Sequence, residues 1–139
     1  MITLAQARAA IDAIVAAIEA AGFSVAVAVV DDRGDLVAAH RMDGCRPRTM
    51  RMTLRKAYTA AVMDRDTSTF HDEIASRQLQ IESYGDPLFC AIPGGVVIRA
   101  ADGTTLGAIG VTGNTKNRDA EFAAAGLPFV TGRPGDATK

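Results

Sequence analysis

Segment 93–114 constrains the fold of this chain more than any other part of its sequence. Two apolar runs, 96–99 and 105–112, flank the dipeptide Asp102-Gly103. An Asp-Gly pair between β-type runs predicts a hairpin, because glycine adopts a positive φ at no steric cost. The second run carries three glycines, which weaken a strand and are typical of close approach by a ligand, a helix or another backbone. These glycines are Gly107, Gly110 and Gly113.

The first half of the chain predicts a helix followed by a second hairpin. Thr3 and Gln6 form a capping-box pattern before apolar residues at helical spacing, and Gly22 ends that helix. Residues 24–30 alternate valine with alanine, and residues 36–40 return as a second strand. Such alternation indicates a central strand that is buried on both faces, with a tightly packed neighbour on its alanine face.

The second half predicts three more helices around the glycine-rich hairpin. We expect them at 48–62, at 68–76 and, after Asn117 as a cap, at 118–125, with 78–92 mostly loop. The element order predicts an α+β fold, an antiparallel sheet packed with helices. The expected apolar side of the 48–62 helix consists of Met52, Leu54, Ala57, Tyr58 and Ala61.

Length and charge bound the class of protein. The 139 residues are enough for one domain, which we expect at 1–127, with a flexible polar tail at 128–139. The net charge of −1 favours neither nucleic acid nor a membrane surface as a partner. No signal-peptide pattern opens the chain, and we expect a cytoplasmic protein with Cys45 and Cys90 reduced.

Five segments, in combination, resemble the GlcG/HbpS (DUF336) family of haem-binding-like proteins over residues 2–127. They are 25–38 (Val-Ala-Val-Ala-Val-Val-Asp-Asp-Arg-Gly-Asp-Leu-Val-Ala), 41–44 (Arg-Met-Asp-Gly), 56–61 (Lys-Ala-Tyr-Thr-Ala-Ala), 93–114 and 119–121 (Asp-Ala-Glu). The resemblance implies a profilin-like or PAS-like architecture with a sheet of four to five strands. It also implies dimers that assemble further into a homo-oligomer. It also implies haem binding, haem degradation or a role beside catabolic enzymes.

The main local anomaly is a cluster of positive charge. Residues 44–63 contain five cations and no acid, and Arg48, Arg51 and Arg55 share one stripe of the expected helix. Guanidinium groups bind carboxylates through two parallel hydrogen bonds, so the stripe fits a pocket for a ligand carboxylate. The alternative is a solvated face or a subunit contact. In that case the partners are Asp64, Asp66, Glu73 or Glu82.

Other candidate site residues lie around this stripe. Lys56 occupies the family's central-helix position, and a partly buried lysine needs an anion, either Asp119 or a ligand. His71 and Glu73 are candidate acid/base groups, and His71 is also the candidate metal ligand, although no spaced metal cluster is present. We expect Gly94, Gly95 and Asn114, at the two ends of the hairpin, to line the ligand site. No helix follows the glycines, so they do not form a phosphate loop.

Three hypotheses for function remain open, and one of them is a non-catalytic ligand sensor or oligomeric scaffold, which would bind a ligand without turnover. The other two are more specific. The first is a protein that binds haem or a related small ligand, with at least one arginine of the stripe pointing into a cavity lined by hairpin 93–114. The second is a small cofactor-free catabolic enzyme, an isomerase, lyase or hydrolase, that acts on an anionic organic acid with His71 and Lys56 as acid and base. Segments 45–51 and 67–90 are more basic and more polar than is usual in the family. These departures, with an aromatic content of 5%, favour a small anionic ligand over haem.

Overall fold

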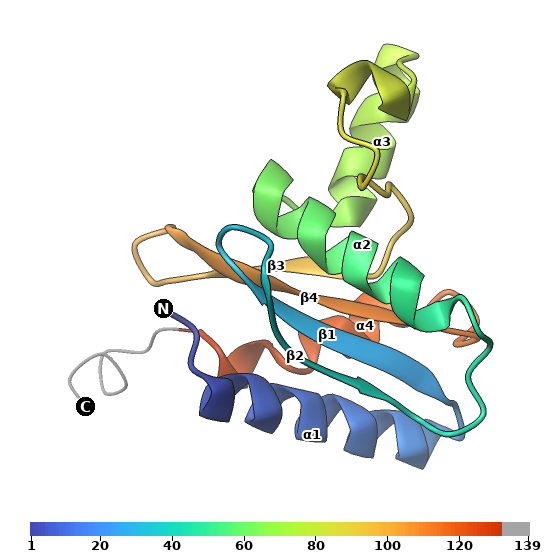
Figure 1. The fold of residues 1–139 in the computed structure, drawn as a ribbon, viewed down its shortest axis with the longest axis vertical. Helices are drawn as coiled ribbons and strands as arrows, with labels where there is room; N and C mark the ends of the chain where they lie inside the picture. Colours follow the sequence, from blue (N-terminus) through green and yellow to red (C-terminus); the bar gives the residue numbers. More distant parts are fainter. Residues whose placement is uncertain (132–139) are drawn as a thin grey trace.

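A four-stranded antiparallel sheet in the order β2-β1-β4-β3 forms the centre of the molecule (Figure 1). The structure, a computed structural model, describes residues 1–131. The strands are β1 (Val25–Asp31), β2 (Leu36–Arg41), β3 (Gly95–Arg99) and β4 (Thr105–Gly113). Both predicted hairpins are confirmed, as is the central position of β1, and the predicted α+β fold has four strands.

Helices cover both faces of the sheet. The elements are α1 (Leu4–Ala21), α2 (Thr49–Met63), α3 (Thr67–Arg77) and α4 (Asp119–Ala124), with 3-10 turns η1 (Ile81–Tyr84) and η2 (Leu127–Phe129). Helices α1 and α4 pack on one face, and α2 packs on the other (Figure 1). The capping box at Thr3 and the left-handed Gly22 are confirmed at the two ends of α1.

The valine face of β1 lies in the larger core. Val25, Val27 and Val29 are fully buried with the isoleucines of α1 and with Phe122 of α4. The opposite face of β1, which carries the alanines, receives α2, as the alternation of large and small side chains predicted.

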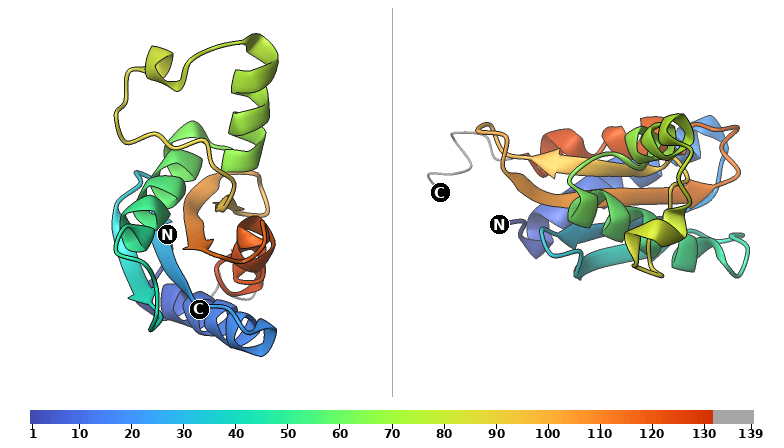
Figure 2. Two further views of the ribbon diagram at one scale, coloured as in Figure 1. Left: turned by 90° about the vertical axis from the view of Figure 1, so that its right-hand side faces the viewer. Right: turned by 90° about the horizontal axis from the view of Figure 1, so that it is seen from above.

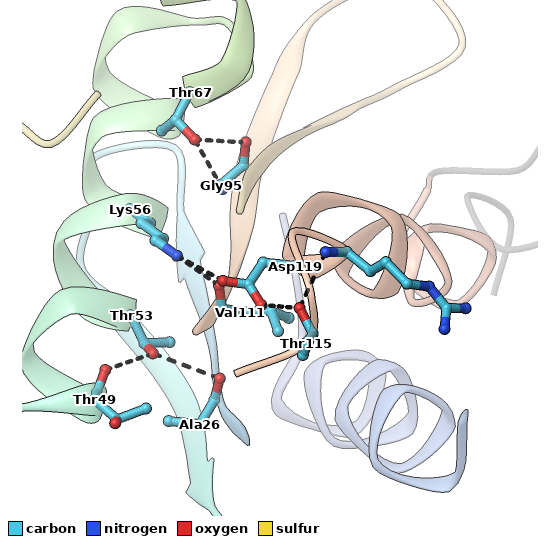
Figure 3. A network of polar contacts seen from close by, with 10 residues as sticks. Ala26, Thr49, Thr53, Lys56, Thr67, Gly95, Val111, Thr115 and Asp119 are labelled. Atoms are coloured by element: carbon cyan, nitrogen blue, oxygen red, sulfur yellow. Dashed lines mark hydrogen bonds and ion pairs between the residues drawn. The ribbon is translucent and has the colours of Figure 1, made fainter. Parts of the chain in front are cut away.

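The backbone of α2 lies directly against the sheet, and this explains two of the glycines, Gly95 and Gly110. A Cβ atom at Gly110 would lie 2.4 Å from the carbonyl oxygen of Thr53, and one at Gly95 would lie 2.4 Å from that of Lys56. At these two positions the close neighbour is a helix, whereas at Gly107 and Gly113 it is the backbone at or next to β1. The Thr53 hydroxyl donates to the carbonyl of Thr49 at 2.8 Å and lies 3.5 Å from that of Ala26 (Figure 3).

The predicted apolar side of α2 is wrong in part. Leu54 and Met52 are only half-buried, whereas the face against the sheet consists of small or polar residues. Its buried residues are Thr49, Thr53, Lys56, Ala57, Thr59, Ala60 and Ala61. Large apolar side chains do not fit where two backbones are in contact, so hydrophobicity alone selected the wrong register.

The start of α4 also differs from the prediction. Asn117 lies in the left-handed region with a φ of 67°, and the residue at the cap position is Arg118, which makes no side-chain capping bond. Thr115 instead accepts a hydrogen bond from the Arg118 N–H at 3.1 Å. The polar group that organises this turn therefore lies two residues before the predicted cap.

Helix α3, η1 and the following loop stand away from the sheet as an arm (Figure 2). The predicted helix at 68–76 is confirmed as α3, and the predicted loop contains η1. Side chains at the base of α3 bond to the outer edge of β3. Asp66 accepts from the Val97 N–H at 2.9 Å, and Thr67 accepts from the Gly95 N–H at 2.9 Å.

The expected domain boundary at residue 127 falls at the start of η2. Val130 is still buried in the core, and residues 132–139 of the expected tail lie outside the described residues. Within residues 1–131, every helix is too short or too polar to cross a lipid bilayer.

Replacing Gly110 with alanine tests the contact between α2 and β4. The added methyl must push α2 away from the sheet, so we expect a loss of about 1–3 kcal/mol in the free energy of unfolding, measured by chemical denaturation. Gly103→Asn is the control. Gly103 has a φ of +87° with nothing within 4 Å of an added Cβ, and asparagine tolerates that conformation. Equal effects of the two changes would contradict the close contact.

Candidate functional site

Lys56 is fully buried and forms an ion pair within the protein. Its Nζ lies 3.0 Å from Asp119 Oδ2 and donates to the carbonyl of Val111 at 3.1 Å, while the Asp119 side chain is 15% exposed (Figure 3). Thr115 donates to the other oxygen of Asp119 at 2.5 Å. Of the two anions expected near Lys56, Asp119 or a ligand, the structure has Asp119 of α4.

This ion pair joins the two helical layers. Lys56 belongs to α2 and Asp119 to α4, on opposite faces of the sheet. The lysine side chain passes Gly94, where a Cβ would lie 2.8 Å from Nζ. A glycine just before β3 leaves room for this passage. The charge of Lys56 is thus compensated inside the fold by Asp119.

The three arginines of the stripe lie together on the outward side of α2. Arg48, Arg51 and Arg55 line a surface hollow of about 430 Å³. The rest of its lining is Met52 of α2 and segment 89–92, which leads from the arm towards β3. The stripe predicted from sequence is confirmed as one face. The predicted location of its cavity is wrong, because segment 89–92 forms the wall in place of hairpin 93–114.

The acids proposed as alternative partners of the stripe are mostly engaged elsewhere. Asp64 pairs with Arg99 at 2.7 Å, and Glu73 pairs with Arg65. Asp66 accepts from the backbone of β3. Among residues 1–131, neither Arg48 nor Arg51 has an acidic partner.

A segment that the sequence analysis treated only as loop is tied to α2 at three points. We call residues 86–92 the strap. The Tyr58 hydroxyl donates to Asp86 at 2.6 Å, Arg55 Nη1 donates to the Pro87 carbonyl at 3.2 Å, and the Cys90 N–H donates to Thr59 Oγ1 at 2.9 Å. These contacts hold the strap beside the arginines and complete the hollow.

The Tyr58–Asp86 bond perturbs both groups. The hydroxyl of Tyr58, followed by the Leu88 N–H, holds the pKa of the Asp86 carboxyl below its usual value. The same bond, followed by burial, raises the pKa of Tyr58. Because the pKa of Asp86 is lowered in the folded state, the ionised carboxylate stabilises the folded protein at neutral pH. This contribution to the free energy of unfolding is lost as the pH falls through the lowered pKa.

The other predicted site residues lie apart from this hollow. His71 is 57% exposed on α3 and contacts Asp72, while Glu73 bonds to Arg65. Gly94 and Gly95 are buried beside Lys56, and Asn114 is exposed in the loop after β4. His71 and Lys56 do not form a shared acid/base site, since Lys56 points towards α4 and His71 lies on the arm.

No group of three or more potential metal ligands occurs within the described part of the chain. His71 accordingly lacks companion ligands for the metal role suggested for it, and Cys45 and Cys90 are free thiols in the structure.

Comparison with known proteins gives consistent matches. A family model described as haem-degrading protein HbpS-like matches residues 2–128. Protein GlcG of Escherichia coli strain K12 is 36% identical over 90 residues, and this match spans 65% of each chain. A double mutant of HbpS from Streptomyces reticuli is 32% identical with a TM-score of 0.81, covering 91% of this chain and 84% of that one. The structure of a PduOC–heme complex has a TM-score of 0.78 over 88% of this chain and 90% of that one; at 21% identity it shows the fold alone.

The Lys56–Asp119 pair predicts a strong asymmetry between single and double substitutions. Asp119→Asn leaves a buried ammonium without a counter-charge, so we expect unfolding free energy to fall by about 3–5 kcal/mol. The double variant Lys56→Met/Asp119→Leu should recover most of that loss in the same denaturation experiment. Glu121→Gln breaks the exposed Arg118–Glu121 pair and should have a much smaller effect. A double variant no more stable than the single one would contradict a compensating pair.

Proposed function

The chain belongs to the HbpS-like family of haem-degrading proteins, and on that premise we propose that it binds haem or a related small ligand through the basic hollow on α2. The observation that carries the proposal is the meeting of Arg48, Arg51 and Arg55 with apolar side chains in one hollow. Cations beside apolar surface are complementary to a ligand with an apolar body and carboxylate groups.

The electrostatics of α2 support an anion at this position. The positive end of the helix dipole lies at its N-terminus, and no acid occupies the first turn. Arg48 is the cap residue and Arg51 follows in the first turn, so both add positive charge where the helix already favours an anion. The positive charges of the two arginines and of the helix N-terminus repel one another, and a bound carboxylate would reduce that repulsion. We therefore expect ligand binding to raise the melting temperature of the protein.

The residues around the hollow include the kinds of groups that haem needs. Arg48 and Arg51 would hold the propionates, Phe89 would contact the ring, and the sulfur atoms of Met52 and Cys90 are donors able to ligate iron. When bound, haem would supply iron-centred chemistry, and the chain's own contribution is to hold the carboxylates and to cover part of the ring.

We also propose a cytoplasmic homo-oligomer. Side chains of the arm satisfy backbone N–H groups on the outer edge of β3. Within the described residues, no side-chain bond of this kind protects the outer edge of β2, which begins with the exposed Leu36. An unprotected edge strand is a template for pairing with a second copy.

Haemin titration tests the ligand proposal. We expect a Soret shift that saturates near about one equivalent per chain, and Arg51→Ala should weaken binding by about 1.5–3 kcal/mol, the scale of a charge-assisted hydrogen bond. Arg77→Ala, on α3 and outside the hollow, is the matched control and should leave the affinity unchanged. If Arg51→Ala binds haemin as tightly as the parent protein, the basic hollow is not the site.

Light scattering tests the oligomer. We expect a mass well above that of the 14.5 kDa chain at micromolar concentration. Leu36→Lys, at the exposed start of β2, should reduce that mass, because a charge on an edge strand opposes pairing. A parent protein that scatters as a clean monomer would end the proposal.

A further inference from the structure

We infer that the hollow between α2 and the strap selects flat aryl carboxylates, which Arg48 and Arg51 bind directly while Arg55 acts as a positioning residue. This inference rests on the proposed ligand-binding function and narrows it to a chemical class. It also divides the three arginines, which look equivalent in the sequence, into two roles.

The contacts of Arg55 separate it from the other two arginines. Its Nη1 donates to the Pro87 carbonyl at 3.2 Å, so its guanidinium is committed to the strap. It also lines both the basic hollow and a neighbouring hollow of about 500 Å³ beside Glu82 and Asp86. Arg55 therefore lies between the two hollows, and its bond to Pro87 holds the part of the strap that separates them.

Arg48 and Arg51 have neither an acidic partner nor a backbone acceptor among the described residues. They lie in the N-terminal part of α2, where the helix dipole reinforces their charge. A carboxylate that reaches this end of the hollow meets two free guanidinium groups, each able to bind it through two hydrogen bonds.

The remaining lining calls for a flat apolar body. Phe89 is held in place by other rings, with centroids 5.9 Å from Phe70, 6.1 Å from Tyr58 and 6.4 Å from Tyr84. A side chain fixed in this way loses little conformational entropy when a ligand packs against it. Aromatic ligands stack on phenyl and guanidinium planes alike, and both kinds of plane line this hollow.

The exposed side chains and the volume agree with this class of ligand. Ile92 is 47% exposed at the rim, beside the arginines. The hollow of about 430 Å³ lies at the lower end of the range for small-molecule sites, about 300–1,000 Å³. A bicyclic aryl carboxylate is therefore small enough to enter the hollow with its ring against Phe89.

Calorimetric titration with 2-naphthoate and its neutral analogue 2-naphthamide tests the inference. The parent protein should bind naphthoate about 10- to 100-fold more tightly than naphthamide, because only the acid engages the guanidinium groups. Arg48→Ala and Arg51→Ala should each lower the affinity for naphthoate towards that for naphthamide and leave naphthamide binding unchanged.

The positioning role has a different signature. Arg55→Ala and Tyr58→Phe both remove a tether of the strap, and the second does so without changing charge. Each should weaken naphthoate and naphthamide by the same factor, so that the ratio of the two affinities stays near the parent value. Arg77→Ala is the control for a distant charge, and far-UV circular dichroism verifies that each variant is folded.

Haemin measured in parallel separates this inference from the broader proposal. Naphthoate binding with the expected pattern supports the inference even if haemin does not bind. In that case the proposal that haem is the ligand is wrong. Haemin binding that depends on Arg51 without naphthoate binding overturns the inference and leaves the proposed function standing. Equal affinity for naphthoate and naphthamide, or a loss of the acid/amide ratio in Tyr58→Phe, also overturns it.

Discussion

The contact between the backbone of α2 and the sheet is the constraint on which the rest of the structure depends. Gly95 and Gly110 allow carbonyl groups of α2 to lie where side chains normally would. The helix can then present only small residues to the sheet, such as Ala57 and Ala60. Lys56 is the one large side chain on that face, and it extends beyond the start of β3 to reach Asp119. One contact thus determines both the register of α2 and the need for a buried ion pair.

The same constraint shapes the outward face of α2. With its small residues turned to the sheet, the helix directs Arg48, Arg51 and Arg55 away from it. The strap adds a second surface opposite these arginines. It is held there by hydrogen bonds donated by Arg55 and Tyr58 and by one that Thr59 accepts from Cys90. The candidate site therefore lies between α2, which is fixed by its contact with the sheet, and the strap, which is hydrogen-bonded to α2. A site made in this way is formed before a ligand arrives.

The parts of the structure that sequence reasoning predicted are those with local causes. The Asp102-Gly103 turn, the capping box at Thr3 and the arginine spacing on α2 each depend on residues a few positions apart. The cap of α4 was assigned two residues away from the polar group that organises the turn, but the errors on α2 and at the hollow have non-local causes. The buried face of α2 is decided by glycines about 40 or more residues later, and the Tyr58–Asp86 bond joins positions 28 residues apart. The wall of the hollow was misplaced for the same reason, since only the arm's path through space brings Phe89 to the arginines.

Everything proposed for the site depends on ligand carboxylates binding to the arginines on the outward face of α2. An anomalous difference map from crystals soaked with 6-bromo-2-naphthoate tests it most directly, because bromine marks the position of the ring without reference to affinity. We predict a single strong peak beside Met52 and Phe89, with the carboxylate within hydrogen-bond distance of Arg48 or Arg51. A peak beside Lys56, beside Asn114 or in the hollow lined by His40 and Phe23 would contradict it.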